Sequence, residues 1–248
     1  MKTRSITLLI LAFLVGATLP MASAATTTNM YQNFDTNMVG DMPSGWGQGG
    51  SAGYAIVTNN LFVSSPNSLV LVNTNGGSPA YAIRSPSPTI NSNFDQQVQV
   101  KYSIYLAQKE ASYSFRADDF ATISLFRLAF DNAGHITAFT NGGSRTVANW
   151  DTGLWYHVTL DFIPSNKIYS VSVSTNGGLF ASMGGLTFEN NNRNFEYVYL
   201  QTYGALGKDT YGYFDDISVI INPIPEPALG GIVALGVGLL LWHRRRSA

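Results

Sequence analysis

The sequence predicts an all-β protein, an antiparallel two-sheet jelly-roll sandwich. Apolar and polar residues alternate with a period of two along several stretches, as in strands that bury one face. Asn-Gly and Asp-Asn-Ala-Gly turns separate these stretches. Residues 25–222 carry no convincing helical stripe. Helices are expected only at the two ends, as an N-terminal signal peptide and a short C-terminal transmembrane helix.

The first 24 residues have the organisation of a secretory signal peptide. Lys2 and Arg4 precede an apolar stretch over residues 6–17, and the small residues Ala22 and Ala24 fit the rule for signal cleavage. An uncleaved N-terminal membrane anchor is the alternative, although the apolar stretch is short for a bilayer. We therefore expect residues 25–248 to be exported.

Strands are expected in order along residues 25–222. The clearest are 97–106 and 155–162, in which every second residue is apolar. Further strands are expected at 54–57, 68–72, 80–83, 122–130, 136–139, 168–174, 198–203 and 213–221. Many short antiparallel strands over this length are typical of two packed sheets in one domain.

The turns between these strands use recurring residues. Thr-Asn-Gly-Gly occurs at 74–77, 140–143 and 175–178, and Asn-Gly supplies the positive φ angles of tight hairpins. The segment Asp131–Gly134 predicts another hairpin. The residues that flank the three copies do not repeat, so we interpret them as shared turn chemistry.

Composition excludes several classes of function. Residues 25–222 contain nine Lys and Arg against fourteen Asp and Glu, which argues against nucleic acid as a partner. The chain has no cysteine, so disulfides, thiolate metal sites and a cysteine nucleophile are excluded. Stability must come from the hydrophobic core or from a bound ion.

Residues 223–248 form a separate C-terminal segment. Its apolar run, 228–242, would rise about 22 Å as a helix, short of the roughly 30 Å hydrocarbon core of a bilayer. We expect it to insert with its basic end in the cytoplasm; a buried core helix is the alternative. The residues expected to anchor it at the interface are Trp242, Arg244, Arg245 and Arg246.

Three features of this segment occur in a specific order. The triplet Pro225, Glu226 and Pro227 comes first, and a short glycine-rich apolar helix and terminal arginines follow. This order resembles the PEP-CTERM sorting signal of exported bacterial proteins. The resemblance implies recognition by an exosortase-type processing enzyme, cleavage at or near the triplet, and delivery to the cell surface, outer envelope or extracellular matrix after transient membrane anchoring.

A second resemblance covers residues 25–222. The segments 33–35, 40–46, 154–158 and 213–217 resemble features of concanavalin-like and laminin-G-like sandwich domains and of related carbohydrate-binding modules. The resemblance implies a jelly roll, but a shared fold does not assign a ligand.

The same resemblance implies a structural calcium ion between the first and last strands. By position, the matching residues are Asp35 and either Asp215 or Asp216. Hard oxygen ligands from both ends of the domain would stabilise a chain that has no cysteine. The alternative is that these are solvated or turn carboxylates.

Two sequence patterns match catalytic motifs but lack the secondary structure that these motifs require. The G-x-S-x-G pattern at 49–53 leads into a strand instead of a helix, and the G-x-G-x-x-G pattern at 45–50 is interpreted as a loop. A glycosidase needs two carboxyl groups across a cleft, whereas the neighbours Asp118 and Asp119 would point to opposite faces of a strand. We expect no catalysis.

Aromatic residues provide the candidates for ligand binding. Trp155, on the polar face of its strand, is the first candidate for stacking on a sugar, and Trp150 and Trp46 follow. The sequence therefore predicts an exported, non-catalytic cell-surface or matrix protein. A lectin-like module that binds exopolysaccharide is the alternative, and a degenerate glycoside hydrolase or polysaccharide lyase is the third.

Overall fold

A computed structural model describes residues 25–222 except 52, 75, 77 and 177. Thr26–Asn222 form one compact unit. The predicted signal peptide, the sorting triplet and the apolar tail lie outside the described residues. No helix within the described ranges is long and apolar enough to cross a membrane.

The described residues of this unit form fifteen strands and one short 3-10 helix, Pro164–Asn166. The strands are β1 Thr27–Gln32, β2 Gly47–Gly49, β3 Gly53–Thr58, β4 Ser68–Asn73, β5 Ala80–Arg84, β6 Gln97–Leu106, β7 Ser112–Asp118, β8 Ser124–Phe130, β9 His135–Thr140, β10 Gly143–Asn149, β11 Trp155–Ile163, β12 Ile168–Thr175, β13 Gly178–Thr187, β14 Tyr197–Tyr203 and β15 Thr210–Asn222.

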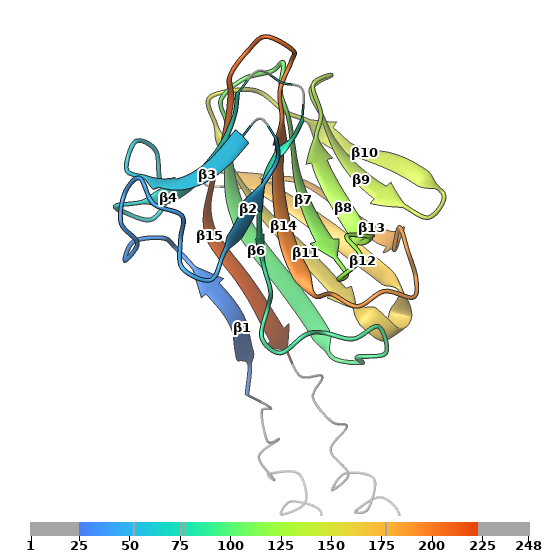
Figure 1. Ribbon diagram of the computed structural model, residues 1–248. Helices are drawn as coiled ribbons and strands as arrows, with labels where there is room; N and C mark the ends of the chain where they lie inside the picture. Colours follow the sequence, from blue (N-terminus) through green and yellow to red (C-terminus); the bar gives the residue numbers. More distant parts are fainter. Residues whose placement is uncertain (1–24, 52, 75, 77, 177, 223–248) are drawn as a thin grey trace, which may run out of the picture. The chain divides into compact units, whose positions relative to one another are not determined.

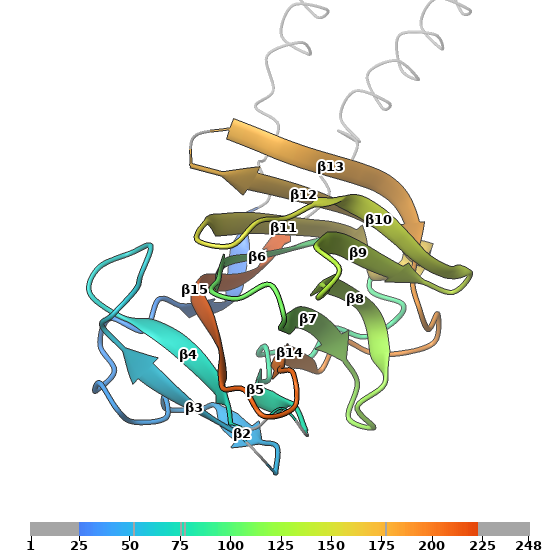
Figure 2. The ribbon, with the colours of Figure 1, turned by 90° about the horizontal axis from the view of Figure 1, so that it is seen from above.

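The strands form two antiparallel sheets, as the sequence predicts. The eight-stranded sheet has the order β13-β12-β11-β6-β15-β4-β3, with β1 also paired to β15. The seven-stranded sheet has the order β10-β9-β8-β7-β14-β5-β2. Figure 1 shows the strands of both sheets, and the view from above in Figure 2 shows the sheets as two layers. Thr27 pairs with Ile221, so the unit begins and ends on neighbouring strands.

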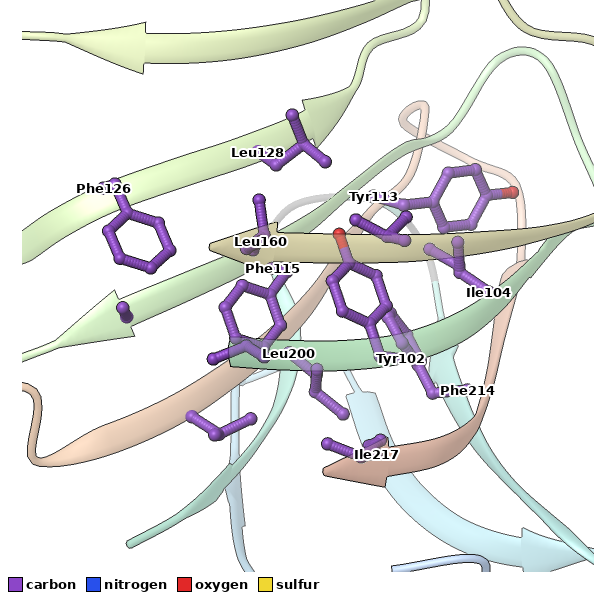
Figure 3. Close-up of a cluster of buried hydrophobic side chains, with 14 of the residues drawn as sticks. Tyr102, Ile104, Tyr113, Phe115, Phe126, Leu128, Leu160, Leu200, Phe214 and Ile217 are labelled. Atoms are coloured by element: carbon purple, nitrogen blue, oxygen red, sulfur yellow. The ribbon is translucent and has the colours of Figure 1, made fainter. Parts of the chain in front are cut away.

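The core lies between the two sheets. Alternation places Tyr102 of β6 and Phe214 of β15 on one inner face and Phe115 of β7 and Leu200 of β14 on the other (Figure 3). The rings of Tyr102 and Phe115 stack across the interface with their centres 4.8 Å apart. Burying one such side chain stabilises the fold by about 1.5–3 kcal/mol, so this layer holds the sheets together.

Three of the four predicted turns join hairpins, and the fourth has the predicted positive φ at Gly76 but joins no hairpin. Asp131–Gly134, 140–143 and 175–178 join the antiparallel neighbours β8–β9, β9–β10 and β12–β13. Residues 74–77 instead lie between β4 and β5, which belong to different sheets. The pattern at 45–50, predicted as a loop, includes the short strand β2.

Candidate functional site

Two of the three predicted tryptophans lie in the core. Trp46 is 8% exposed and Trp150 is 1% exposed. The Trp150 indole nitrogen donates a hydrogen bond to the backbone oxygen of Asp131 at 3.0 Å, which satisfies its one polar group. Neither ring offers an open face on which a sugar could stack, so these two residues are corrected to core residues.

Trp155 lies on the outer face of the eight-stranded sheet, as its alternation predicts. Its ring centre is 5.6 Å from that of Tyr105, which is 5.9 Å from that of Tyr213. The first pair of rings is tilted by 55° and the second meets edge to face at 81°, so the three rings form no single flat surface. A role for Trp155 in binding stays a prediction.

The outer face of the seven-stranded sheet carries a second aromatic surface, centred on β14. Val198 and Leu200 point into the core, so the alternate residues of this strand point away from it. We call the following set the β14 face: Tyr197, Tyr199, Gln201 and Tyr203 of β14, together with Tyr81 of β5, Arg116 of β7 and Phe120 of the β7–β8 loop.

Aromatic pairs follow β14 along this face. The rings of Phe120 and Tyr197 are 6.5 Å apart with a 37° tilt, and Phe120 is 79% exposed. The rings of Tyr81 and Tyr199 stack at 4.9 Å. Tyr203, at the far end of the strand, is 46% exposed. Partly exposed rings are therefore available at both ends of the β14 face.

Arg116 joins this surface to a network of buried polar groups. Its guanidinium carbon lies 4.6 Å from the centre of the Tyr199 ring, and its Nη2 lies 2.7 Å from Oδ2 of Asp118. Arg116 Nε and Asp118 Oδ1 each hydrogen-bond the Ser124 hydroxyl at 2.9 Å. Burial raises the pKa of the Asp118 carboxyl, and the neighbouring Arg116 opposes this effect.

Two further contacts fix the middle of the face. Gln201 is only 4% exposed, and its Oε1 accepts a hydrogen bond from the Ser114 hydroxyl at 3.3 Å. Gly49 of β2 lies directly beside the end of the Tyr81 ring, where a Cβ atom would overlap with it. The missing side chain at Gly49 therefore lets Tyr81 lie across the neighbouring strand.

Burial and the three aspartates predicted as calcium ligands all raise the pKa of one tyrosine, Tyr31. Burial is the largest cause that raises the pKa of Tyr31. The nearby carboxylates raise it further, in the order Asp216, Asp215 and Asp35. The Ser64 hydroxyl donates to Asp216 Oδ1 at 2.8 Å, and the Asn67 N-H approaches Asp35 Oδ1 at 3.4 Å. All three carboxylates thus act electrostatically on Tyr31.

Asp215 itself does not fit the role of a calcium ligand. Its oxygens accept hydrogen bonds from the backbone N-H groups of Val63, Ser64 and Asp216, at 2.8, 3.1 and 2.8 Å. Across the part of the chain that the structure describes, no group of three or more Asp, Glu, His or Cys residues is arranged to hold a metal ion. Asp35 and Asp216 remain the candidates, and calcium stays a prediction.

The β14 face is not among the binding surfaces expected from the sequence. The segment 197–203, Tyr-Val-Tyr-Leu-Gln-Thr-Tyr, does contain a usable pattern, because tyrosines and a glutamine alternate with Val198, Leu200 and Thr202. Phe120 and Tyr81 come from other parts of the chain, and only the sheet order brings them beside β14.

Comparison with known proteins identifies the fold. Neither protein-family models nor curated proteins gave a match. A sialidase matches with a TM-score of 0.60 and 12% identity over 79% of this chain, which spans only 19% of the sialidase. A carbohydrate esterase from the Shiga toxin-encoding bacteriophage phi24B matches with a TM-score of 0.56 and 14% identity over 80% of this chain and 100% of that one.

Plant lectins are also similar. Peanut lectin matches with a TM-score of 0.52 and 13% identity over 81% of this chain and 99% of the lectin. At such low sequence identity, the structural similarity establishes the fold and does not identify a ligand. The chain therefore has the two-sheet β-sandwich fold that the sequence predicts, and it shares this fold with the lectin.

Proposed function

We propose that this protein is an exported, non-catalytic polysaccharide-binding protein of the bacterial cell surface or extracellular matrix. The observation that carries the proposal is the β14 face, on which partly exposed aromatic rings and their phenol hydroxyl groups lie along one strand. Aromatic rings stack on the apolar faces of sugars, and amides and hydroxyls hydrogen-bond their hydroxyl groups.

The fold is consistent with this proposal. Peanut lectin and lectin UEA-II, which was solved with galactose, share the β-sandwich. They support a carbohydrate ligand by analogy only, because one fold hosts many functions. The β14 face supplies the independent argument from this chain's own residues.

The carboxylates near the face favour binding over catalysis. A glycosidase needs a proton-donating carboxyl group that reaches the substrate and a second carboxylate across the cleft. Asp118 is 0% exposed and paired with Arg116, and Asp119 is paired with Arg193 at 3.0 Å. Both carboxylates are thus engaged with arginines of the same chain.

Sorting through the C-terminal segment belongs to the same proposal. The order of Pro225, Glu226 and Pro227, an apolar helix and arginines supports it. Cleavage by an exosortase-type enzyme would release the domain to the surface. Intact mass of protein recovered from the cell surface should show loss of the residues after the triplet. A mature protein that keeps its terminal arginines would contradict this part.

Binding is tested with the purified full-length chain in mild detergent, by affinity electrophoresis through gels that contain a panel of soluble polysaccharides. At least one polysaccharide should retard the protein, and Phe120→Ala with Tyr197→Ala should reduce the retardation. Tyr54→Ala is the matched control, because Tyr54 is an exposed tyrosine of the eight-stranded sheet. Absence of retardation by every polysaccharide, or equal retardation of all variants, would refute the proposal. Release of new reducing ends would identify an enzyme instead.

A further inference from the structure

We infer that the β14 face selects an uncharged, linear polysaccharide and discriminates against polymers rich in carboxylate or sulfate groups. The inference rests on the proposed function and specifies the chemical class of its ligand. It follows from how the charged side chains at this face are paired.

Each of three arginines at or beside the face already holds a carboxylate of this chain. Arg116 pairs with Asp118 at 2.7 Å, and Arg193 pairs with Asp119 at 3.0 Å. Arg127, the cross-strand neighbour of Arg116, pairs with Glu189 at 3.4 Å. The positive charge that would attract an acidic polymer is neutralised locally.

Arg116 uses further donors within the chain, whereas Arg127 Nε is buried and has no hydrogen-bond partner among the described residues. Arg116 donates to the Ser124 hydroxyl at 2.9 Å and to the backbone oxygen of Thr122 at 2.8 Å. The guanidinium carbon of Arg127 lies 3.7 Å from the centre of the Phe139 ring. An acidic ligand that paired with Arg116 would displace Asp118 from it. The Asp118 carboxylate, which is 0% exposed, would then have no ion-pair partner. A buried charge that loses its partner is strongly unfavourable.

The groups left for a ligand are uncharged. They are the rings of Phe120, Tyr197, Tyr81 and Tyr203, with the phenol hydroxyl groups of the three tyrosines. Tyr197 and Tyr203 are six residues apart in one strand, a span of about 20 Å. This length favours an extended polymer that lies along β14 over a single terminal sugar.

The test compares uncharged and acidic polymers on the full-length chain. Xyloglucan and galactomannan are the uncharged probes, and alginate and polygalacturonate are the acidic ones. We expect an uncharged probe to bind at least about tenfold more tightly than the acidic ones. Its affinity should be nearly constant between about 0.05 and 0.5 M NaCl, because screening acts on charge pairs.

Glu189→Gln tests the role of the ion pairs directly. It removes the carboxylate that neutralises Arg127 and leaves the aromatic rings of the β14 face unchanged. This variant should gain affinity for alginate or polygalacturonate, and the gain should decrease with salt. Asp161→Asn is the matched control, because it removes the same charge from the eight-stranded sheet. A Glu189→Gln variant that binds acidic polymers no better than the control would overturn the role assigned to the ion pair.

The remaining outcomes separate the two proposals. Preferential, salt-sensitive binding of alginate or polygalacturonate by the wild-type chain would overturn the inference and leave the polysaccharide-binding function standing. Binding of none of the polymers would refute the proposed function and the inference with it.

Discussion

The guanidinium carbon of Arg116 lies 4.6 Å from the centre of the Tyr199 ring on the outer face of the seven-stranded sheet. The two residues are cross-strand partners on β7 and β14. A cation over an aromatic face is attracted by the ring and holds its plane in place. Arg116 also pairs with buried Asp118, so one side chain links the stability of the sheet to the position of the aromatic surface.

Removal of Arg116 should therefore destabilise the protein. In Arg116→Met, buried Asp118 loses its partner, and we expect the free energy of unfolding to fall by about 3–5 kcal/mol. Urea denaturation measures this change. The double variant Arg116→Met/Asp118→Asn should recover part of the loss, because no unpaired charge remains buried. A double variant as unstable as the sum of the two single ones would contradict this explanation.

Gly49 controls the position of Tyr81. In Gly49→Ala the new methyl group displaces the Tyr81 ring, so we expect polysaccharide affinity to fall by about tenfold, or about 1.4 kcal/mol. The melting temperature should change little, because the end of the ring can move. Gly142→Ala is the control, since a Cβ there meets no atom within 4 Å. Equal affinity in both variants would show that Tyr81 does not contact the ligand.

Asp215 should make stability depend on pH. Burial raises the pKa of its carboxyl to about 6, although hydrogen bonds from Val63 and Ser64 oppose the shift. The folded state therefore binds this proton more tightly than the unfolded state does. Its contribution to stability is fully present below the ordinary pKa near 4 and is lost as pH rises through about 6.

Asp215→Asn removes this titration. The unfolding free energy of the wild type minus that of the variant should decrease as pH rises from about 4 to 7, by no more than about 1.4 kcal/mol per pH unit. Denaturant titrations at a series of pH values measure the difference. A difference that is constant with pH, or that increases, contradicts the assignment.

Calcium binding is tested by the melting temperature. The prediction is that added calcium raises it, that a chelator lowers it, and that Asp35→Asn abolishes both effects, because only the folded state would gather the ligands. A melting temperature that neither calcium nor the chelator changes would rule out a structural ion at this place.

The sequence predicted the interior strands well and the edges poorly. Strands β6 and β11 bury alternate side chains, so apolar and polar residues alternate along their sequences. The edge strands β10 and β13 bury little and show no such pattern. Strand β2 consists of Gly47, Gln48 and Gly49, in which turn-forming residues form an edge strand against β5.

The candidate site was predicted only in part. Trp155 faces outward as its alternation requires, but Trp150 is buried, with its indole nitrogen hydrogen-bonded to Asp131 in the turn between β8 and β9. The contact between Arg116 and Tyr199 depends on the pairing of β7 with β14, which are far apart in the chain. Sheet order of this kind is not encoded in local patterns.

The central claim is that the β14 face binds the polysaccharide. The most direct measurement is isothermal titration of the full-length chain with an oligosaccharide from the best-binding polymer, comparing Phe120→Ala/Tyr197→Ala with Trp155→Ala. The account predicts that the double variant loses most of the affinity and that Trp155→Ala keeps it. Retained affinity in the double variant, with loss in Trp155→Ala, would place the site on the opposite sheet and contradict the account.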